Sequence, residues 1–348
     1  MIGKNLKYYR LQNNMTKKKI AEKAGISSMA VTHYESNERM PEPAILKKLA
    51  QVLSVSVMDL TASRNENLQF CHGEFRKNSN FGHRKQEYVF ASIESYFDRF
   101  MTVEDFLGAN VLPEPPAIHS LELSENNEIN AARLRNWLGL AESGPVCQLV
   151  SNLENKGILV CLLDVQESGF SGINGTVENY PYIALNSNMT SERQRFTLAH
   201  ELTHMAFSGE YDNEKQANAI AGAFLFPETD VIRELGFRRQ SIQRDMEISA
   251  VEYGISMQCL AYRARECGVI GSAAYESYSR KISYLGWRKN EPSRIESEKP
   301  LLFKQLVYRA IEEEEINIQR GAELLQVPFN DIVRELSDNT EVVNAVQQ

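Results

Sequence analysis

The sequence lacks any apolar run long enough to cross a membrane, and its first residues, Met1-Ile2-Gly3-Lys4, do not have a secretory pattern. Cysteine is scarce as well: there are five in 348 residues, scattered and odd in number. These absences argue against a membrane protein and against a secreted fold held together by disulfides. We therefore expect a cytoplasmic protein whose thiols are reduced and mostly buried.

The chain does contain enough apolar material for more than one core. Its 348 residues are 43% hydrophobic, which is sufficient for two or three domains. The net charge of −8 is unevenly distributed, because residues 1–60 hold ten Lys+Arg and five Asp+Glu. This segment therefore carries +5 and the remainder carries −13. A basic module joined to an acidic body is typical of proteins that bind duplex DNA through its phosphates.

The first 60 residues have the helix pattern of a DNA-binding domain. Thr16 can cap a helix over Lys17–Ala24 that Gly25 ends, and a second helix begins near Ser27. Two short helices joined by a tight glycine turn are typical of a helix-turn-helix, and further helices are expected on both sides of this pair. Over its whole length the segment resembles the XRE-type DNA-binding domains of phage repressors.

The resemblance implies two sets of DNA contacts. The exposed face of the second helix would lie in the major groove through Ser28, Met29, Thr32 and His33. Phosphates would be bound by Lys17, Asn37 and Arg39. XRE-type domains often have glutamine where Lys17 and Ser28 stand, so the base contacts and the operator sequence stay open. Because one such domain binds DNA weakly, we expect a homodimer on a two-fold site. The alternative to DNA binding is that these helices form a packing domain that has lost this activity.

The stretch from Phe196 to Phe207 contains a His-Glu-x-x-His motif within an apolar run of helical spacing. His200 and His204 lie one helical turn apart, so both imidazoles can reach the same point. Two neutral imidazoles suit Zn²⁺, and the carboxylate of Glu201 suits activation of a water molecule. A catalytic zinc usually takes three protein ligands, so the motif requires one more.

Residues 212–227 supply a candidate for that third ligand. Their apolar spacing predicts a second helix that ends near Pro227, with Glu214 in its first turn and Asn218 one turn later. We expect Glu214 to be the third ligand and Asn218 to orient a ligand histidine. The alternative is that Glu214 only complements the helix dipole.

This combination of a His-Glu-x-x-His helix, Glu-x-x-Ala-Asn and Phe-Leu-x-Pro resembles the ImmA/IrrE family of zinc metallopeptidases. The likeness begins near residue 118 and fades after Pro227. It includes three short β-rich segments, Ile158–Leu163, Gly172–Val177 and Tyr182–Leu185. The fold implied is α+β: an all-α helix-turn-helix domain followed by a mainly helical, zincin-like domain with a small β-sheet. By the same resemblance Tyr182–Leu185 would be an edge strand beside the cleft, able to pair with an extended substrate.

These signals predict four parts of the chain: a helix-turn-helix domain at 1–60, a linker and helical segment at 61–117, the metallopeptidase domain at 118–290, and an acidic helical region at 291–348. The polar residues 61–85 form the expected linker, and residues 86–110 predict a helix with an apolar core stripe. Residues 250–263 and 316–327 mimic further helix-turn-helix motifs. Both lie in the acidic part, so packing or partner contact is favoured over DNA binding.

The family resemblance implies metal-assisted peptide hydrolysis. Zn²⁺ held by His200, His204 and Glu214 would make its water more acidic and polarise the scissile carbonyl. Glu201 would take the water's proton and pass it to the leaving amine. The oxyanion donor is open, and Tyr262 and Arg263, on a late helix, are candidates. A further metal site at Cys71-His72 and His83 is not expected, because that spacing matches no common one.

Three functions are compatible with these features. The first is a zinc metalloendopeptidase that cleaves a repressor or another regulatory protein and is placed at an operator by its DNA-binding domain. The second is an antitoxin or autorepressor that binds a partner toxin through a peptidase-like domain without cleaving it. The third is a regulator with a structural or sensory zinc, which the intact Glu201 argues against because such a site needs no general base. We favour a DNA-binding transcriptional regulator that carries a zinc metallopeptidase domain.

Overall fold

The computed structural model describes residues 2–75, 81–108, 111–166, 169–208 and 214–346. The chain divides into two compact units. The helical unit comprises Met1–Phe70, Phe75–Leu112 and Leu302–Gln348, and the α+β unit comprises Cys71–Glu74 and Pro113–Leu301. Helices dominate, and the strands form one four-stranded sheet, so the expected α+β class is confirmed.

The helical unit begins with five short helices. They are α1 (Gly3–Gln12), α2 (Lys17–Ala24), α3 (Ser28–Glu35), α4 (Pro43–Leu53) and α5 (Val57–Thr61). The Thr16 hydroxyl accepts a hydrogen bond from the Lys19 N–H at 3.1 Å and caps α2. Gly25 ends this helix in the left-handed conformation, with a φ of 69°. The bounds predicted for α2 are therefore confirmed, and α3 begins directly after its cap, Ser27.

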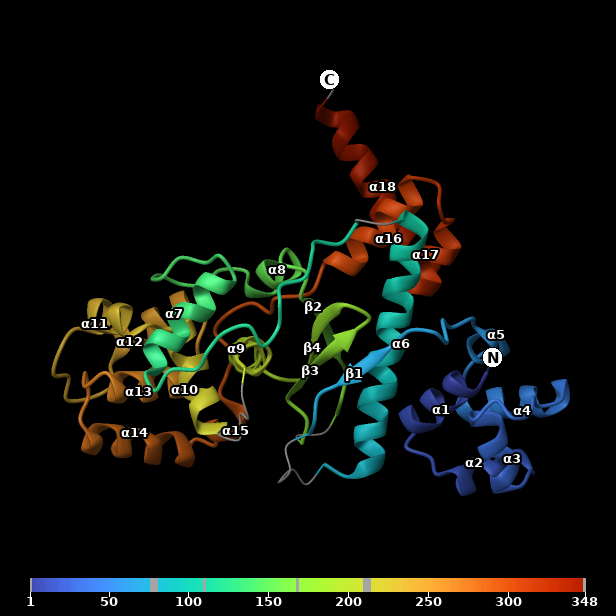
Figure 1. Cartoon of the computed structure of the whole chain (residues 1–348), viewed down its shortest axis with the longest axis horizontal. Helices are drawn as coiled ribbons and strands as arrows, with labels where there is room; N and C mark the ends of the chain where they lie inside the picture. The colour runs from blue at the N-terminus through green and yellow to red at the C-terminus, as the bar shows by residue number, and fades with distance from the viewer. Residues whose placement is uncertain (1, 76–80, 109–110, 167–168, 209–213, 347–348) are drawn as a thin grey trace. The chain divides into compact units, whose positions relative to one another are not determined.

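Four more helices complete the described part of the helical unit: α6 (His83–Leu107), α16 (Leu302–Glu312), α17 (Ile318–Leu325) and α18 (Phe329–Val346) (Figure 1). The apolar stripe predicted along α6 is buried in part: Ile93 and Phe97 are each 0% exposed. Its other members, Tyr88, Phe90 and Tyr96, are half-buried. Arg99 on the same helix donates to the carbonyl oxygen of Leu324 at 2.5 Å. This bond fastens α17 to α6 although the two helices are far apart in the sequence.

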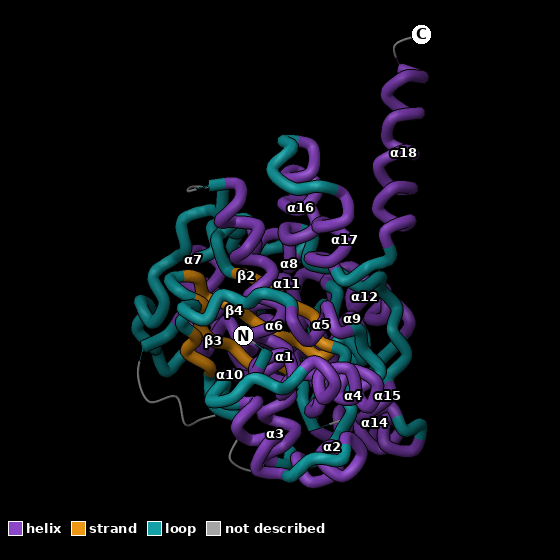
Figure 2. The backbone as a smooth tube through the Cα atoms, turned by 90° about the vertical axis from the view of Figure 1, so that its right-hand side faces the viewer, coloured by secondary structure: helices purple, strands orange, loops and turns teal. Residues whose placement is uncertain are grey.

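The α+β unit surrounds its small sheet with helices. These are α7 (Asn127–Trp137), α8 (Leu149–Glu154), α9 (Ser191–Ala206), α10 (Glu214–Leu225), α11 (Glu228–Leu235), α12 (Arg244–Tyr253), α13 (Met257–Glu266), α14 (Ser272–Tyr284) and α15 (Trp287–Asn290). The strands are β1 (Phe70–His72), β2 (Leu159–Leu163), β3 (Gly172–Val177) and β4 (Tyr180–Asn186), in the order β1-β3-β4-β2. Figure 2 shows β2, β3 and β4 side by side in this sheet.

The order of the strands corrects one expectation. Tyr182–Leu185 lies in β4, which pairs with β2 in parallel and with β3 antiparallel, so it is an inner strand and not an edge. β4 follows β3 in a tight hairpin, while the earlier strand β2 occupies its other side. The outer position beside β3 belongs to β1, which lies within the predicted linker 61–85. Residues 76–80 of that linker lie outside the described residues.

Helix α9 packs on this sheet and on α10, and both helices contribute to one apolar core. Leu198 and Leu202 of α9 and Phe224 of α10 are at most 1% exposed. β3 approaches α9 closely at Gly172, where a Cβ atom would lie 2.6 Å from the Thr197 Cγ2 atom. These contacts hold α9 in place. Its His-Glu-x-x-His motif then lies against β3 and the first residue of α10.

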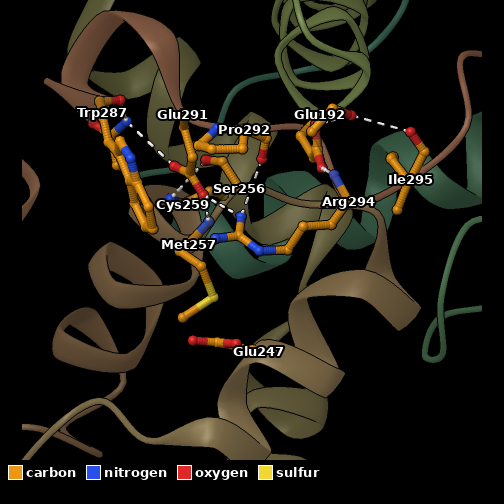
Figure 3. A network of polar contacts seen from close by, with 12 residues as sticks. Glu192, Glu247, Ser256, Met257, Cys259, Trp287, Glu291, Pro292, Arg294 and Ile295 are labelled. Carbon is orange, nitrogen blue, oxygen red and sulfur yellow. Dashed lines mark hydrogen bonds and ion pairs between the residues drawn. The ribbon is translucent and has the colours of Figure 1, made fainter. Parts of the chain in front are cut away.

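An extended segment at residues 291–301 fastens two helix starts of the α+β unit (Figure 3). The Oε1 atom of Glu291 accepts the backbone N–H of Met257, at the start of α13, at 2.8 Å. Arg294 donates to Glu291 at 2.8 Å, and its own backbone N–H donates to Glu192, at the start of α9, at 2.6 Å. The Glu291 carboxylate near the N-terminus of α13 stabilises that helix. The bond from the Arg294 backbone to Glu192 fastens the segment to the helix that carries the His-Glu-x-x-His motif.

Among the described residues, no helix combines the length and apolar character needed to cross a membrane. All five cysteines are free. The expectation that most are buried is wrong, because only Cys161 is buried, while Cys71 and Cys147 are exposed. Desolvation raises the pKa of the Cys259 thiol to about 12, so that thiol is protonated at neutral pH.

Candidate metal centre and DNA-binding surface

The two motif histidines lie one turn apart on α9 and face the same point. Their Nε2 atoms are 3.1 Å apart, and the ring centroids are separated by 4.7 Å. His200 is 2% exposed, whereas His204 is partly exposed. One side of the pair is therefore enclosed by the core and the other is open to solvent.

Glu214, the first residue of α10, completes a group of three possible ligands. Its Oε2 atom lies 3.4 Å from the Nε2 atom of His200, and its side chain is 47% exposed. One ligand atom from each of His200, His204 and Glu214 lies within 4.8 Å of the other two. Within the described part of the chain, this is the group of His, Cys, Asp and Glu side chains that could hold a metal ion.

The spacing of these atoms fits a tetrahedral ion. Ligand atoms bound to zinc at about 2.0–2.1 Å with tetrahedral angles lie about 3.3 Å apart. The distances of 3.1 Å between the two histidines and 3.4 Å between His200 and Glu214 are close to that value. Two imidazoles and one carboxylate also form a donor set found in catalytic zinc sites.

Glu201 is held from the sheet. The residue is only 8% exposed, and its Oε2 atom accepts a hydrogen bond of 2.8 Å from the side-chain amide of Asn174 in β3. Asn174 was not expected from the sequence to belong to the site. The available signal was a polar Asn-Gly pair inside a β-rich segment. Only the packing of β3 on α9 brings that amide to Glu201.

Asn218 was expected beside the metal, and His72 belongs to a separate group with Cys71 and His83 at which no metal site was expected. Asn218 is exposed on α10, and no hydrogen bond of its side chain is found among the described residues. Its role in orienting a histidine stays a prediction. His72 lies with its Nδ1 atom 2.6 Å from the hydroxyl of Tyr182. It forms no metal-ligand group with Cys71 and His83 within the residues described.

Arg263 serves the packing of the α+β unit. Its buried guanidinium donates to the carbonyl oxygen of Phe226 at 3.0 Å, to Glu266 at 2.7 Å and to Glu128 at 2.6 Å. These bonds tie α13 to the end of α10 and to α7, so this guanidinium is not available as an oxyanion donor. Tyr262 is 40% exposed, and its ring packs edge-on against Tyr275.

The residues predicted to read bases gather at the start and outer face of α3. Ser28 and Met29 are exposed, and Met29 is 64% exposed although it is apolar. Thr32 and His33 are half-buried. The Nδ1 atom of His33 lies 2.5 Å from Glu38, so a carboxylate is next to this face.

The three predicted phosphate ligands lie around the same helix. Lys17 reaches across from α2, with its Nζ atom 3.4 Å from the Thr32 hydroxyl. Arg39 is exposed. Asn37 also stabilises the fold, because its Oδ1 atom accepts a hydrogen bond from the backbone N–H of Gly3 at 2.8 Å. Its backbone has the left-handed conformation, with a φ of 59°. This bond ties α1 to the turn that follows α3.

Comparison with known families agrees with this arrangement. Residues 6–60 match the family model described as a helix-turn-helix, and residues 153–265 match the one described as the IrrE N-terminal-like domain, Peptidase_M78. No curated protein matches the chain. The two matches occur in the order predicted from the sequence, so both resemblances are confirmed. The chain thus joins a helix-turn-helix DNA-binding domain to a peptidase-like domain.

Proposed function

We propose that this chain is a DNA-binding transcriptional regulator whose second domain is a zinc metallopeptidase that cleaves a repressor or another regulatory protein. The observation that carries the proposal is the convergence of His200, His204 and Glu214, with their ligand atoms within 4.8 Å, beside a buried glutamate. A structural zinc would need no Glu201, and a buried carboxylate without a chemical task would be costly to retain.

The residues of the site have separate tasks in this proposal. His200, His204 and Glu214 hold the ion, which would polarise the scissile carbonyl and make a water molecule more acidic. Glu201 takes the proton of the attacking water and returns it to the leaving amine. Asn174 positions that carboxylate through its 2.8 Å hydrogen bond. His204 is partly exposed and the Glu214 side chain is 47% exposed, so both ligands can be reached from solvent.

The DNA-binding domain would determine where the peptidase acts. The net charge of +5 on residues 1–60 supports binding to phosphates of double-stranded DNA. We infer that α3 reads an operator through Ser28, Met29, Thr32 and His33, and that two copies bind a two-fold site as a homodimer. A cut in a regulator bound nearby would then change transcription at that operator.

Zinc content and Glu201-dependent cleavage test the proposal together. Wild-type protein purified without added metal should contain one zinc per chain, and His204→Ala should contain none. Glu201→Gln should keep the zinc but lose all cleavage, which can be followed by comparing new protein N-termini in cells that express either form. Zinc without any Glu201-dependent cleavage would favour the antitoxin or autorepressor instead, and absence of zinc would remove the metallopeptidase assignment.

A further inference from the structure

Strand β1 comes from a segment whose neighbours belong to the other unit. Residues Cys71–Glu74 group with the α+β unit, whereas Phe70 before them and Phe75 after them group with the helical unit. In the sheet, β1 takes the outer position beside β3 (Figure 1). A short piece of the connection that follows the DNA-binding domain therefore forms an edge strand of the peptidase-like domain.

This segment meets β3 at the residue that holds the proposed general base. The backbone N–H of Gly73 donates to the carbonyl oxygen of Asn174 at 2.8 Å, and the side chain of Asn174 donates to Glu201 at 2.8 Å. The backbone of residues 71–74 thus lies two hydrogen bonds away from the Glu201 carboxylate.

Glycines allow the two backbones to approach each other. A Cβ atom on Gly73 would lie 2.6 Å from the Asn174 carbonyl oxygen, and one on Gly175 would lie 2.5 Å from the Cys71 carbonyl oxygen. Contacts below 3.0 Å are essentially never seen for a Cβ atom. The close approach therefore depends on Gly175 in β3 and on Gly73, the residue directly after β1.

A side-chain bond adds to the main-chain pairing. The Nδ1 atom of His72 lies 2.6 Å from the hydroxyl of Tyr182, a residue of β4 that is 0% exposed. Tyr182 reaches this position across Gly175, whose missing side chain leaves the space for its ring. A buried tyrosine hydroxyl is stabilised by a hydrogen-bond partner, and here His72 supplies one.

An exposed sheet edge binds an extended peptide through main-chain hydrogen bonds. The edge of β3 at Asn174 is the one adjacent to Glu201, so an extended substrate paired there would pass beside the metal centre. We propose that residues 71–74 are an internal occupant of this peptide-binding edge, and that the site accepts an extended polypeptide only after they leave it. This inference rests on the proposed function and describes how the same site is regulated.

The competition favours the internal segment until something displaces it. A segment tethered to its site has an effective concentration in the millimolar range, which exceeds the concentration of most free peptides. The segment is nevertheless short, since β1 has 3 residues. Because both of its flanks continue into the helical unit, a change in that unit can pull the segment from β3 along the chain itself. DNA or partner binding would then release peptidase activity.

The simpler alternative is a permanent fourth strand that completes the sheet. The two interpretations predict different results when the strand is weakened. Removal of a permanent strand would destabilise the domain, and the exposed edge of β3 would not bind a peptide of that sequence specifically. Removal of an internal occupant would leave the domain folded and create a binding site for a peptide of the same sequence.

The experiment uses full-length, zinc-loaded protein and the double variant His72→Ala/Gly73→Pro. The variant lacks the bond to Tyr182, and its proline has no N–H to donate to Asn174. Cys71→Ser and Glu74→Gln are matched controls, because both residues are exposed and neither change removes the Gly73 N–H. The probe is a fluorescent synthetic peptide with the sequence of residues 69–75, and hydrogen exchange over residues 70–74 and 172–177 reports release of the strand.

The double variant should exchange rapidly over residues 70–74 and bind the peptide at least about tenfold more tightly than the wild type or either control. A segment that stays protected, or a released edge that does not bind the peptide, would overturn the proposal. A double variant that loses its zinc or its cooperative unfolding, while both controls keep them, would indicate a permanent strand and would also overturn the proposal.

Cleavage separates this inference from the proposed function. If the released variant cleaves fluorescein-labelled casein faster than the wild type, and Glu201→Gln in the same background abolishes that cleavage, both proposals are supported. Peptide binding without any cleavage would support the internal occupant and count against the peptidase. Equal Glu201-dependent cleavage by the wild type and the released variant would overturn the internal occupant and leave the peptidase standing.

Discussion

The side-chain amide of Asn174 donates a hydrogen bond of 2.8 Å to the Oε2 atom of Glu201, joining strand β3 to helix α9. Glu201 is 8% exposed, so water contributes little to its solvation. The bond therefore has two consequences: it compensates a buried carboxylate, and it fixes the direction in which the proposed general base points.

Replacing Asn174 with alanine should affect stability and cleavage together. Loss of a donor to a buried carboxylate costs about 1–3 kcal/mol, measurable as a lower free energy of unfolding in urea. A misplaced base should also slow Glu201-dependent cleavage by up to about 100-fold. Asn174→Asp should be worse in both respects, because it sets two carboxylates side by side. Wild-type stability in both variants would show that the amide is not needed to hold Glu201.

Zinc affinity should distinguish Glu214 from Asn218, which lie one turn apart on α10. Glu214 approaches His200 to 3.4 Å, whereas Asn218 is exposed. Glu214→Gln should therefore weaken zinc binding most strongly. Asn218→Ala should weaken it by about 10–100-fold, the usual cost of removing a residue that orients a ligand histidine. A dissociation constant of Asn218→Ala within a factor of about three of the wild type would contradict the role expected from the sequence.

These residues show where sequence reasoning succeeds. The helix bounds of α2 and the convergence of His200 and His204 follow from local rules: a capping hydroxyl, a left-handed glycine and a spacing of one helical turn. Glu214 required one further step, the prediction of a second helix start. Such features lie within a few residues of each other, so the chain's own geometry determines them.

The features that were missed are non-local. β1 lies in a polar linker without a strand pattern, and it becomes a strand because β3 offers an unpaired edge beside it. The inner position of β4 depends on β2, which precedes it by about 20 residues, as their pairing register shows. Asn174 and Arg263 likewise acquire their roles from partners on other elements. No local pattern specifies which strand will be adjacent to which helix.

A buried ion pair inside the helix-turn-helix should dominate the stability of that domain. Arg10 and Glu35 form two hydrogen bonds, at 2.5 and 3.1 Å, and both side chains are 5% exposed. Arg10→Met would leave Glu35 buried without its main partner and should lower the free energy of unfolding by about 3–5 kcal/mol. The more accessible pair of Lys7 and Glu87, whose side chains are 42% and 34% exposed, is the control, and Lys7→Ala should cost less than about 1 kcal/mol. Equal losses in the two variants, measured by urea unfolding, would contradict this ranking.

Asp98 should make the helical unit less stable as the pH rises. Desolvation by burial raises the pKa of this carboxyl in the folded state, although Arg64 opposes the shift. A carboxyl whose pKa is raised in the folded state binds its proton more tightly there than in the unfolded chain. The protein therefore loses stability as the pH rises above 3.8, the pKa of the unfolded group, and the loss ends once the folded group has also ionised. Asp98→Asn can still accept the Asn65 N–H, which now donates to Asp98 at 2.7 Å.

The difference in unfolding free energy between Asp98→Asn and the wild type isolates this contribution from those of other carboxyls. The difference should be smallest near pH 3.5 and should grow in favour of the variant as the pH rises toward neutrality. Urea unfolding at a series of pH values measures it. A variant that is less stable than the wild type at neutral pH would mean that the ionised carboxylate gains more from Arg64 than it loses by burial.

Salt dependence should separate the two kinds of DNA contact expected around α3. Arg39 is exposed, and a phosphate contact from it would release counterions, so Arg39→Ala should weaken binding to all duplexes and reduce the slope of log K against log salt by about one. Met29, which is 64% exposed, should instead affect sequence preference, and Met29→Ala should leave that slope unchanged. Fluorescence anisotropy with a selected duplex and a random duplex, from 50 to about 200 mM salt, measures both effects. If neither variant changes binding to either duplex, α3 is a packing helix, and the regulator must reach its operator through a partner.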